Sequence, residues 1–144
     1  MTEVVTTTRW YLELDGITEG VFKEASGFEA RIASIEYRAA GKGGQSILQK
    51  IPGSVSWANI VLRRGLSSDA ALWDWWQLVE QTGAEGNRKN GTLTCYNAEN
   101  QAVVRYSFRR GWICRYKGPT MDASKNEIAI EEIEICHEGL ERQS

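Results

Sequence analysis

Hydrophobic and polar residues alternate with a period of two along most of the chain, which is typical of half-buried β-strands. In "RWYLELDG", Trp10, Leu12 and Leu14 share one face of a predicted strand, and Asp15-Gly16 follows as a turn. The same alternation predicts strands in "SVSWANIVL" (54–62), in "GTLTCYNAENQAVVRYSF" (91–108), where "NAENQ" is the turn of a hairpin, and in "GWICRYKG" (111–118). We therefore expect a mainly β, antiparallel fold.

The alternation changes phase in two segments. In "NEIAIEEIEIC" the apolar residues are Ile128, Ile130, Ile133 and Ile135. The two pairs of isoleucines differ in parity, so a β-bulge at Glu131 and Glu132 would let both pairs face the core. "FEARIASIEYR" shows the same slip between Ile32 and Ile35. Two long strands with such slips predict a curved antiparallel β-barrel or sandwich.

One α-helix is expected at about residues 69–82, around "LWDWWQLVEQTG" (72–83). Ser67, Ser68 or Asp69 can cap its N-terminus, and Gly83 can end it in the left-handed conformation. Its predicted buried face consists of Leu72, Trp73, Trp75, Trp76 and Val79. This apolar arc is wider than one sheet can cover. Either another subunit covers the excess, or loops of the same chain do.

A glycine-rich stretch, "AAGKGGQSILQKIPG" (39–53), separates two predicted strands. It lacks the spacing of a phosphate-binding P-loop, and no strand-to-helix switch follows it. We interpret it as a long mobile loop, because loops of this length in a compact domain are usually functional or disordered. The segment Gly41, Lys42, Gly43, Gly44, Gln45 and Ser46 is predicted to reach a neighbouring subunit or ring.

The 144 residues suit a single domain, 1–144, and the residue types argue against catalysis. There is one histidine, His137, with no nucleophile motif beside it. The three cysteines, Cys95, Cys114 and Cys136, are widely spaced and form no Cys-x-x-Cys pair, so no metal or cofactor is expected. The paired carboxylates of "EEIE" on a strand indicate a solvated face.

Charge and hydropathy exclude further classes. The net charge of −2 and the lack of aromatic residues among the basic spots argue against specific nucleic-acid binding. No apolar run approaches the length of a membrane span, and "MTEVVTTTRW" does not resemble a signal peptide. We expect synthesis in the cytoplasm. One alternative function is a small-ligand, flavin-like binding β-barrel that uses the tryptophan cluster as a stacking site.

A series of motifs resembles the tail-tube protein family of contractile phages and phage-like contractile injection systems. In order, they are "SGF", "YRAAGKGG", "KIPGSVSWANIVLRRG", "LWDWW" and "RYKGPTMDASKNEIAIEEIEICHEGL". The similarity runs from about Trp10 to Leu140, and it rests on the order and spacing of the motifs. Phe28 stands where many relatives carry leucine, and the Trp75-Trp76 pair is heavier than usual.

This resemblance implies a structural protein rather than an enzyme. Its implied fold is a β-barrel protomer with one flanking helix, and six protomers would close a ring whose sheets join into an inner barrel. Stacked rings would form a hollow tube that carries cargo in its lumen. The implied partners are further copies of the chain, a sheath protein, and baseplate and tube-terminating proteins. The assembled particle would be a phage tail or an injection particle, and the subunit would be the repeated tube protein or a baseplate-proximal initiator.

Overall fold

The computed structural model describes residues 9–15, 17–65, 70–119 and 129–143. In this part of the chain there are ten β-strands, one α-helix and a short 3₁₀ turn at Lys42–Gly44. The elements are β1 (Arg9–Leu14), β2 (Ile17–Phe22), β3 (Glu24–Ser26), β4 (Ala30–Ala40), β5 (Ser46–Trp57), β6 (Ile60–Gly65), α1 (Ala71–Thr82), β7 (Lys89–Tyr96), β8 (Ala102–Lys117), β9 (Ile130–Cys136) and β10 (Leu140–Gln143). The expected mainly β fold with one helix is confirmed.

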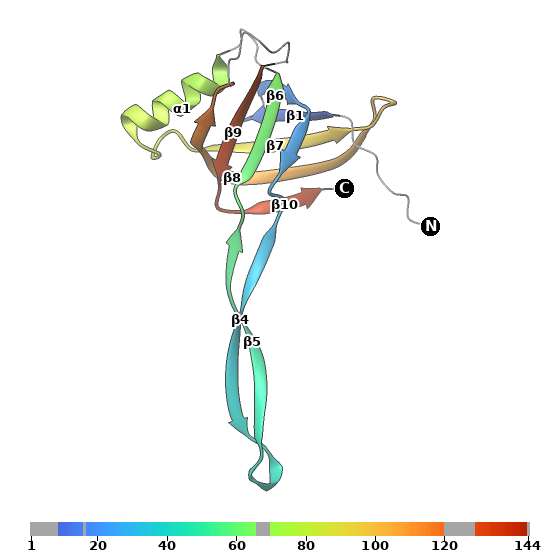
Figure 1. Cartoon of the computed structure of the whole chain (residues 1–144), viewed down its shortest axis with the longest axis vertical. Coiled ribbons are helices and arrows are strands. Elements are labelled where there is room, and N and C mark those ends of the chain that lie inside the picture. The colour runs from blue at the N-terminus through green and yellow to red at the C-terminus, as the bar shows by residue number, and fades with distance from the viewer. Residues whose placement is uncertain (1–8, 16, 66–69, 120–128, 144) are drawn as a thin grey trace, which may run out of the picture.

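The strands form two separate sheets, and Figure 1 shows that they occupy different parts of the molecule. The body holds β1–β3, β6–β10 and α1, with the strand order β2-β1-β7-β8-β9-β6-β3 and with β10 paired to β8. The arm, Ala30–Trp57, is the β4–β5 hairpin, which extends far out from the body. All pairings are antiparallel.

The body sheet curls back on itself through its longest strand. The first half of β8 pairs with β7 and β10, and its second half pairs with β9. The two end strands, β2 and β3, follow each other in the chain, and the Lys23 N–H between them donates to the Arg63 carbonyl at 3.1 Å. The predicted curvature is therefore present, although the hydrogen-bonded order of the described strands remains an open path from β2 to β3.

The core lies on the inner face of this curved sheet and beneath α1. Leu12 and Leu14 are buried there as the alternation predicted, and so are Leu93 and Phe108 of the predicted hairpin. The complete core cluster is Leu12, Leu14, Phe22, Ile60, Leu62, Leu72, Trp75, Leu93, Phe108, Ile113, Ile133 and Ile135. These side chains come from six strands and the helix, so burial of apolar area joins all parts of the body.

The predicted bulge at Glu131 and Glu132 is wrong. β9 pairs with β6 in an uninterrupted register from Ile135 opposite Ile60 to Ile130 opposite Gly65. Glu131 therefore points inward, on the same face as Ile133 and Ile135. The irregularity lies instead on β8, between Ile113 and Arg115. Alternation is preserved in β9 because the buried Glu131 carboxylate is paired with Arg64, as described below. Ile128 lies outside the described residues.

Two further expectations need correction in the arm. The predicted loop at 39–53 is mostly strand, because β4 runs to Ala40 and β5 begins at Ser46. The predicted strand at 54–62 is divided, because Ala58 and Asn59 separate β5 from β6. The expected slip after Ile32 is confirmed as a register shift between Ile32 and Ser34. Residues of β4 pair with residues of β5 along the hairpin. The interpretation based on glycine content missed this pairing.

The helix agrees closely with its expected bounds. It spans Ala71–Thr82, and Gly83 follows with a φ of 84°, a region that favours glycine. The Gly83 N–H donates to the Val79 carbonyl at 2.9 Å. The predicted capping residues at 67–69 lie outside the described residues. In the helix, Leu72 and Trp75 are buried, whereas Trp73 is 41% exposed, so the prediction that Trp73 is buried is wrong for the single chain.

Candidate functional site

The arm is a two-faced ribbon without a core. Residues directly opposite each other in an antiparallel pair share a face, and these faces alternate along the strand. The register places Ile35 opposite Ile51, Tyr37 opposite Gln49 and Ala39 opposite Ile47 on one face. On this face Ile32, Ile35, Tyr37, Ile47, Ile51 and Val55 are between 44% and 59% exposed, and Leu48, opposite Arg38 on the other face, is 46% exposed. The apolar face of the arm thus lies open in the single chain.

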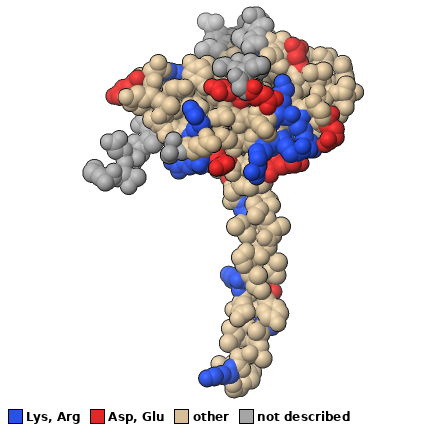
Figure 2. All heavy atoms as spheres, turned by 180° about the vertical axis from the view of Figure 1, so that it is seen from behind, with Lys and Arg blue, Asp and Glu red and all other residues tan. Residues whose placement is uncertain are grey.

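The arm also has free backbone edges and a basic charge. β4 and β5 pair only with each other in the described chain, so each has an outer edge of unpaired N–H and C=O groups. Four basic residues and one acidic residue lie in 30–57, although acidic residues outnumber basic ones in the chain as a whole. Figure 2 shows basic side chains along the arm and at its tip, and mixed charges over the body. A long, apolar, unpaired edge is a template for pairing with another chain.

The predicted loop segment Gly41–Ser46 is the tip of this arm. Lys42–Gly44 form the 3₁₀ turn, and Gly43 and Gly44 both have a φ of 77°. The Gly41 N–H donates to the Gln45 carbonyl at 2.5 Å and closes the turn. Positive φ at two successive positions explains why the tip is built from glycine. The structure brings these residues together at the point farthest from the body (Figure 1).

Hydrogen bonds hold the root of the arm to the body. The Ala58 N–H donates to the Glu29 carbonyl at 3.1 Å, which closes the base of the hairpin. The Ala58 carbonyl accepts from His137 Nε2 at 3.0 Å, and His137 Nδ1 accepts from the Gly139 N–H at 3.3 Å. This arrangement specifies a neutral imidazole with its proton on Nε2. Burial lowers the pKa of His137 below its ordinary value, which favours the same neutral form.

The "SGF" motif belongs to this root. Gly27 has a φ of 92°, and a Cβ there would collide with the Asn59 carbonyl oxygen, so the close approach requires glycine. Phe28 stacks between Trp10 and Tyr106, with ring centroids 5.0 Å and 4.4 Å apart respectively. The aromatic stack thus anchors the point where the chain leaves the body for the arm.

The helix presents an aromatic surface on its outer side. Trp75 is buried, and its indole N–H donates to the Asn87 carbonyl at 2.9 Å. Trp73 stacks on Trp76 with ring centroids 5.0 Å apart and meets the Tyr116 ring edge-on at 5.0 Å. Trp76 and Val79 are partly buried against the core. The tryptophans therefore pack on each other and on the body, and the Trp73 face remains open.

A buried ion pair lies beneath β6 and β9. Arg64 and Glu131 are only 6% and 4% exposed, and the Arg64 guanidinium bonds to the Glu131 carboxylate. Glu131 also accepts from the Tyr116 hydroxyl at 2.6 Å, and Arg64 lies over the Phe22 ring. Burial, followed by the bond to Glu131, raises the pKa of Tyr116 to about 12. This cluster has a structural role, because its opposite charges neutralise each other inside the core.

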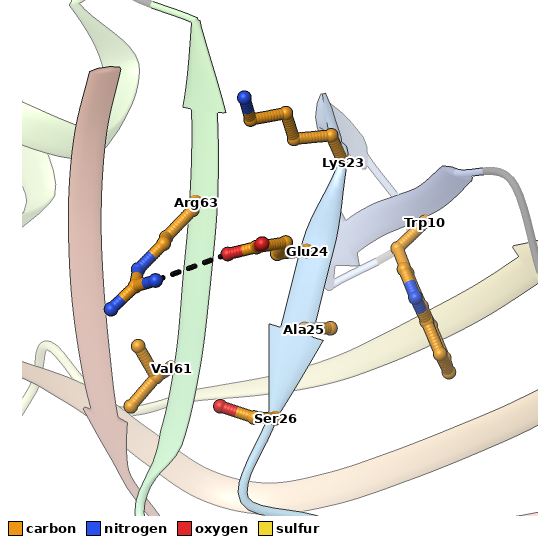
Figure 3. Close-up of a pocket in the computed structure, with 7 residues that line it drawn as sticks. All are labelled: Trp10, Lys23, Glu24, Ala25, Ser26, Val61 and Arg63. Atoms are coloured by element: carbon orange, nitrogen blue, oxygen red, sulfur yellow. Dashed lines mark hydrogen bonds and ion pairs between the residues drawn. The ribbon is translucent and has the colours of Figure 1, made fainter.

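A surface hollow of about 380 Å³ lies beside β3, the last strand of the body sheet. The Arg63 guanidinium bonds to the Glu24 carboxylate at 3.1 Å. Figure 3 shows this pair on one side of β3 and Trp10 on the other. Its lining residues are Trp10, Lys23, Glu24, Ala25, Ser26, Val61 and Arg63. The Arg63 and Glu24 side chains are both about half exposed to solvent. The hollow is a feature of the sheet edge, and the tryptophans of the helix do not line it.

The sequence analysis singled out the residues at the tip of the arm and the helix. It missed three structural features: the inward-facing side chain of Glu131, the hydrogen bonds of His137 at the root of the arm, and the aromatic stacking of Phe28. The sequence features were weak, since "EEIE" on a strand is typical of a solvent-exposed face and a single histidine forms no motif that predicts its contacts. Among the described residues, no group of three or more His, Cys, Asp or Glu is placed to hold a metal ion. The helix in the described chain lacks the length and apolar character needed to cross a bilayer.

Comparisons with known proteins agree on the class. The family model described as T4-like virus tail tube protein gp19 matches residues 6–141. No curated protein matches the chain in sequence. Among solved structures, the chain is similar to one in the sheath-tube complex of an extracellular contractile injection system, PVC, in its extended state. The TM-score is 0.82 at 23% identity, with 98% of this chain and 92% of the other covered.

Two other solved structures share the fold. A chain in the anti-feeding prophage cap, the AFP tube terminating cap, gives a TM-score of 0.84 at 23% identity and covers 100% of this chain and 93% of its own. Hcp1 from Flavobacterium johnsoniae gives a TM-score of 0.54 at 13% identity, with 93% and 94% covered. At these identities the structural matches establish only the fold. The family is established by the match of the family model to residues 6–141.

Proposed function

The chain belongs to the T4-like virus tail tube protein family, and from this premise we propose that it is an inner-tube subunit of a contractile injection system or phage tail. In this proposal six copies close into a ring, and rings stack into a tube with a hollow lumen for cargo. The family is structural, which agrees with the expectation that the protein is not an enzyme.

The observation that carries the proposal is the open arm. An isolated two-stranded hairpin is marginally stable in water. Here seven large apolar residues of the arm are about half exposed, and both outer edges are unpaired in the described chain. Pairing with a second copy would cover the apolar face and satisfy the backbone edges together. The arm is therefore the part of the chain that needs a neighbour.

Charge supports the choice of a second copy as that neighbour. The arm is basic, and the rest of the chain carries thirteen basic and eighteen acidic residues. Opposite charges on the arm and body favour a contact in which the arm of one copy lies on the body of the next. This head-to-tail geometry closes a ring when the rotation is suitable and otherwise builds an open helical filament. The segment Gly41–Ser46 would make the farthest contact.

The aromatic helix face is the second assembly surface in this proposal. Trp73 is 41% exposed, so its side of α1 offers apolar area to a neighbour. Exposed apolar patches of this kind commonly mark protein contacts. The neighbour is an adjacent subunit of the ring. The sheath, cap and baseplate named for the similar structures are further proposed partners, and the assembled tail or particle is the proposed location.

The direct test is negative-stain electron microscopy of the purified chain, combined with analytical ultracentrifugation. We expect rings or hollow rods at high concentration. Deleting Gly41–Ser46 should leave a folded monomer, by circular dichroism, that assembles poorly. A wild-type chain that stays monomeric at every concentration would contradict the proposal, and normal rods from the deletion variant would remove the tip from the interface.

A matched pair of variants tests the face of the arm. Ile35→Asp places a carboxylate on the apolar face, and Ser34→Asp places the same group on the neighbouring, opposite face. Both positions are exposed, so both variants should keep the stability of the single chain. We expect Ile35→Asp to abolish rods and Ser34→Asp to retain them. Rods from both variants would exclude the apolar face as the contact.

A second matched pair tests the helix. Trp73→Ser removes the exposed indole, and Gln81→Ser changes an exposed residue of the same helix. Trp73→Ser should shift the concentration needed for rods upward several-fold, whereas Gln81→Ser should leave it unchanged. Sedimentation at a series of concentrations measures this shift. Equal behaviour of the two variants would mean that the Trp73 face remains in solvent in the assembly.

A further inference from the structure

Cys114 and Cys136 come together at the bulge between β8 and β9. Trp112 pairs with Cys136 and Ile113 with Ile135, and the register then shifts before Arg115 pairs with Glu134. Cys114 is the extra residue in this shift, so it has no directly opposite partner. Cys136 lies opposite Trp112, two residues before Cys114, and its thiol interacts with that of Cys114. The two strands thus place the two thiols diagonally across the strand pair.

The two thiols are half-buried and form no disulfide in the structure. Cys114 Sγ lies 3.5 Å from the Glu134 carbonyl oxygen and 3.5 Å from its Oε2. Asn59 Nδ2 lies 3.8 Å from the same sulfur. The third cysteine, Cys95, is fully buried on β7 in another part of the sheet. A reagent from solvent can therefore meet Cys114 and Cys136 while the fold protects Cys95.

We propose that Cys114 and Cys136 form an oxidisable dithiol, which closes an intrachain disulfide by exchange with a small disulfide such as oxidised glutathione. This inference needs only the folded chain and is independent of the proposed function. A thiolate of the pair attacks one sulfur of the small disulfide and releases one small thiol. The second cysteine then attacks the protein-bound sulfur and releases the second small thiol. The pair loses two electrons and two protons, and the small disulfide gains them.

The surroundings of Cys114 favour its protonated form. Burial, followed by the interactions with Cys136 and Glu134, raises the pKa of the Cys114 thiol. Because the thiolate is the nucleophile, this slows attack by Cys114 itself. Either cysteine of the pair can take up the first small thiol, and the other then resolves the mixed disulfide. The closed bond would tie β8 to β9 at the position where their register changes.

The experiment uses the purified, reduced full chain, incubated with oxidised glutathione, then denatured and alkylated for intact mass measurement. Wild type should lose two hydrogen atoms and keep one thiol for alkylation, and peptide mapping should join Cys114 to Cys136. Cys95→Ser, the matched control, should lose two hydrogens and keep no thiol. Cys114→Ser and Cys136→Ser should each stop as a glutathione adduct on the remaining cysteine of the pair. The same incubation in denaturant shows how far the fold directs the pairing.

Three alkylatable thiols in oxidant-treated wild type would overturn the proposal. A bond that involves Cys95, or bonds only between chains, would do the same. Circular dichroism of each serine variant checks that it is folded, and peptide mapping of the wild type decides the question if a variant is not. Oxidised wild type should also melt a few degrees above the reduced form.

Discussion

Leu93 in β7 and Ile35 in β4 both lie in antiparallel strand pairs, yet Leu93 is fully buried and Ile35 is 53% exposed. The body folds its strands around a core, so each strand gains from burial as well as from backbone pairing. The arm gains only from pairing between β4 and β5 and from its attachment at the root. Equal secondary structure therefore carries unequal stability, and the arm is the region whose apolar area stays exposed in the single chain.

The largest loss of stability is expected when the buried ion pair of the body is broken. Glu131→Ala removes the carboxylate that faces the Arg64 guanidinium inside the core. Breaking a buried pair from one side costs about 3–5 kcal/mol. Urea unfolding of the single chain measures the loss. Glu24→Ala is the control, because Glu24 and its partner Arg63 are both about half exposed and its loss should cost about 0–1 kcal/mol. Equal losses for the two variants would contradict the buried pair.

The next effect compares isoleucines in the two regions. Ile133→Ala removes a fully buried side chain from the body and should lower the free energy of unfolding by about 2–5 kcal/mol. Ile35→Ala makes the same change on the open face of the arm and should stay within about 0.5 kcal/mol in the single chain. Urea unfolding at concentrations too low for assembly measures both. A large loss for Ile35→Ala would show that the arm is covered within its own chain.

The smallest change in stability is expected from protonation of His137, which connects the root of the arm to the body. The pKa of His137 is lowered in the folded chain, so the unfolded chain binds the proton more readily. The stability that neutral His137 contributes is therefore present above the ordinary histidine pKa and is lost as the pH falls through it. Protonation of Nδ1 also removes the acceptor for the Gly139 N–H, which loosens the root of the arm.

This pH dependence is measured by urea unfolding on either side of the ordinary histidine pKa, about 6.5. Wild type should lose more stability on acidification than His137→Gln, which has no imidazole to titrate. Because His137 is the only histidine, its proton resonance should titrate alone and below the ordinary value. An identical pH dependence of the two proteins would exclude the imidazole as the link between root and body.

Several features were predictable because they depend on local patterns. Period-two alternation located β1 and the β7–β8 hairpin, and the tryptophan-rich stretch with Gly83 located α1. The slip after Ile32 predicted the irregularity in the arm. The Gly41–Ser46 segment was predicted as part of a long loop over 39–53, because glycine content suggested a loop where most of the chain forms strands.

The amino-acid sequence by itself determined the class of fold, the helix and the family, because alternation, turn residues and motif order are local properties. Only the tertiary structure decided where single side chains lie. It turned Glu131 into the core because Arg64 on the neighbouring strand supplies the opposite charge, and it moved the bulge to β8. It left Trp73 and Ile35 in solvent because burial depends on what lies opposite a residue in space, which no pattern along one chain specifies.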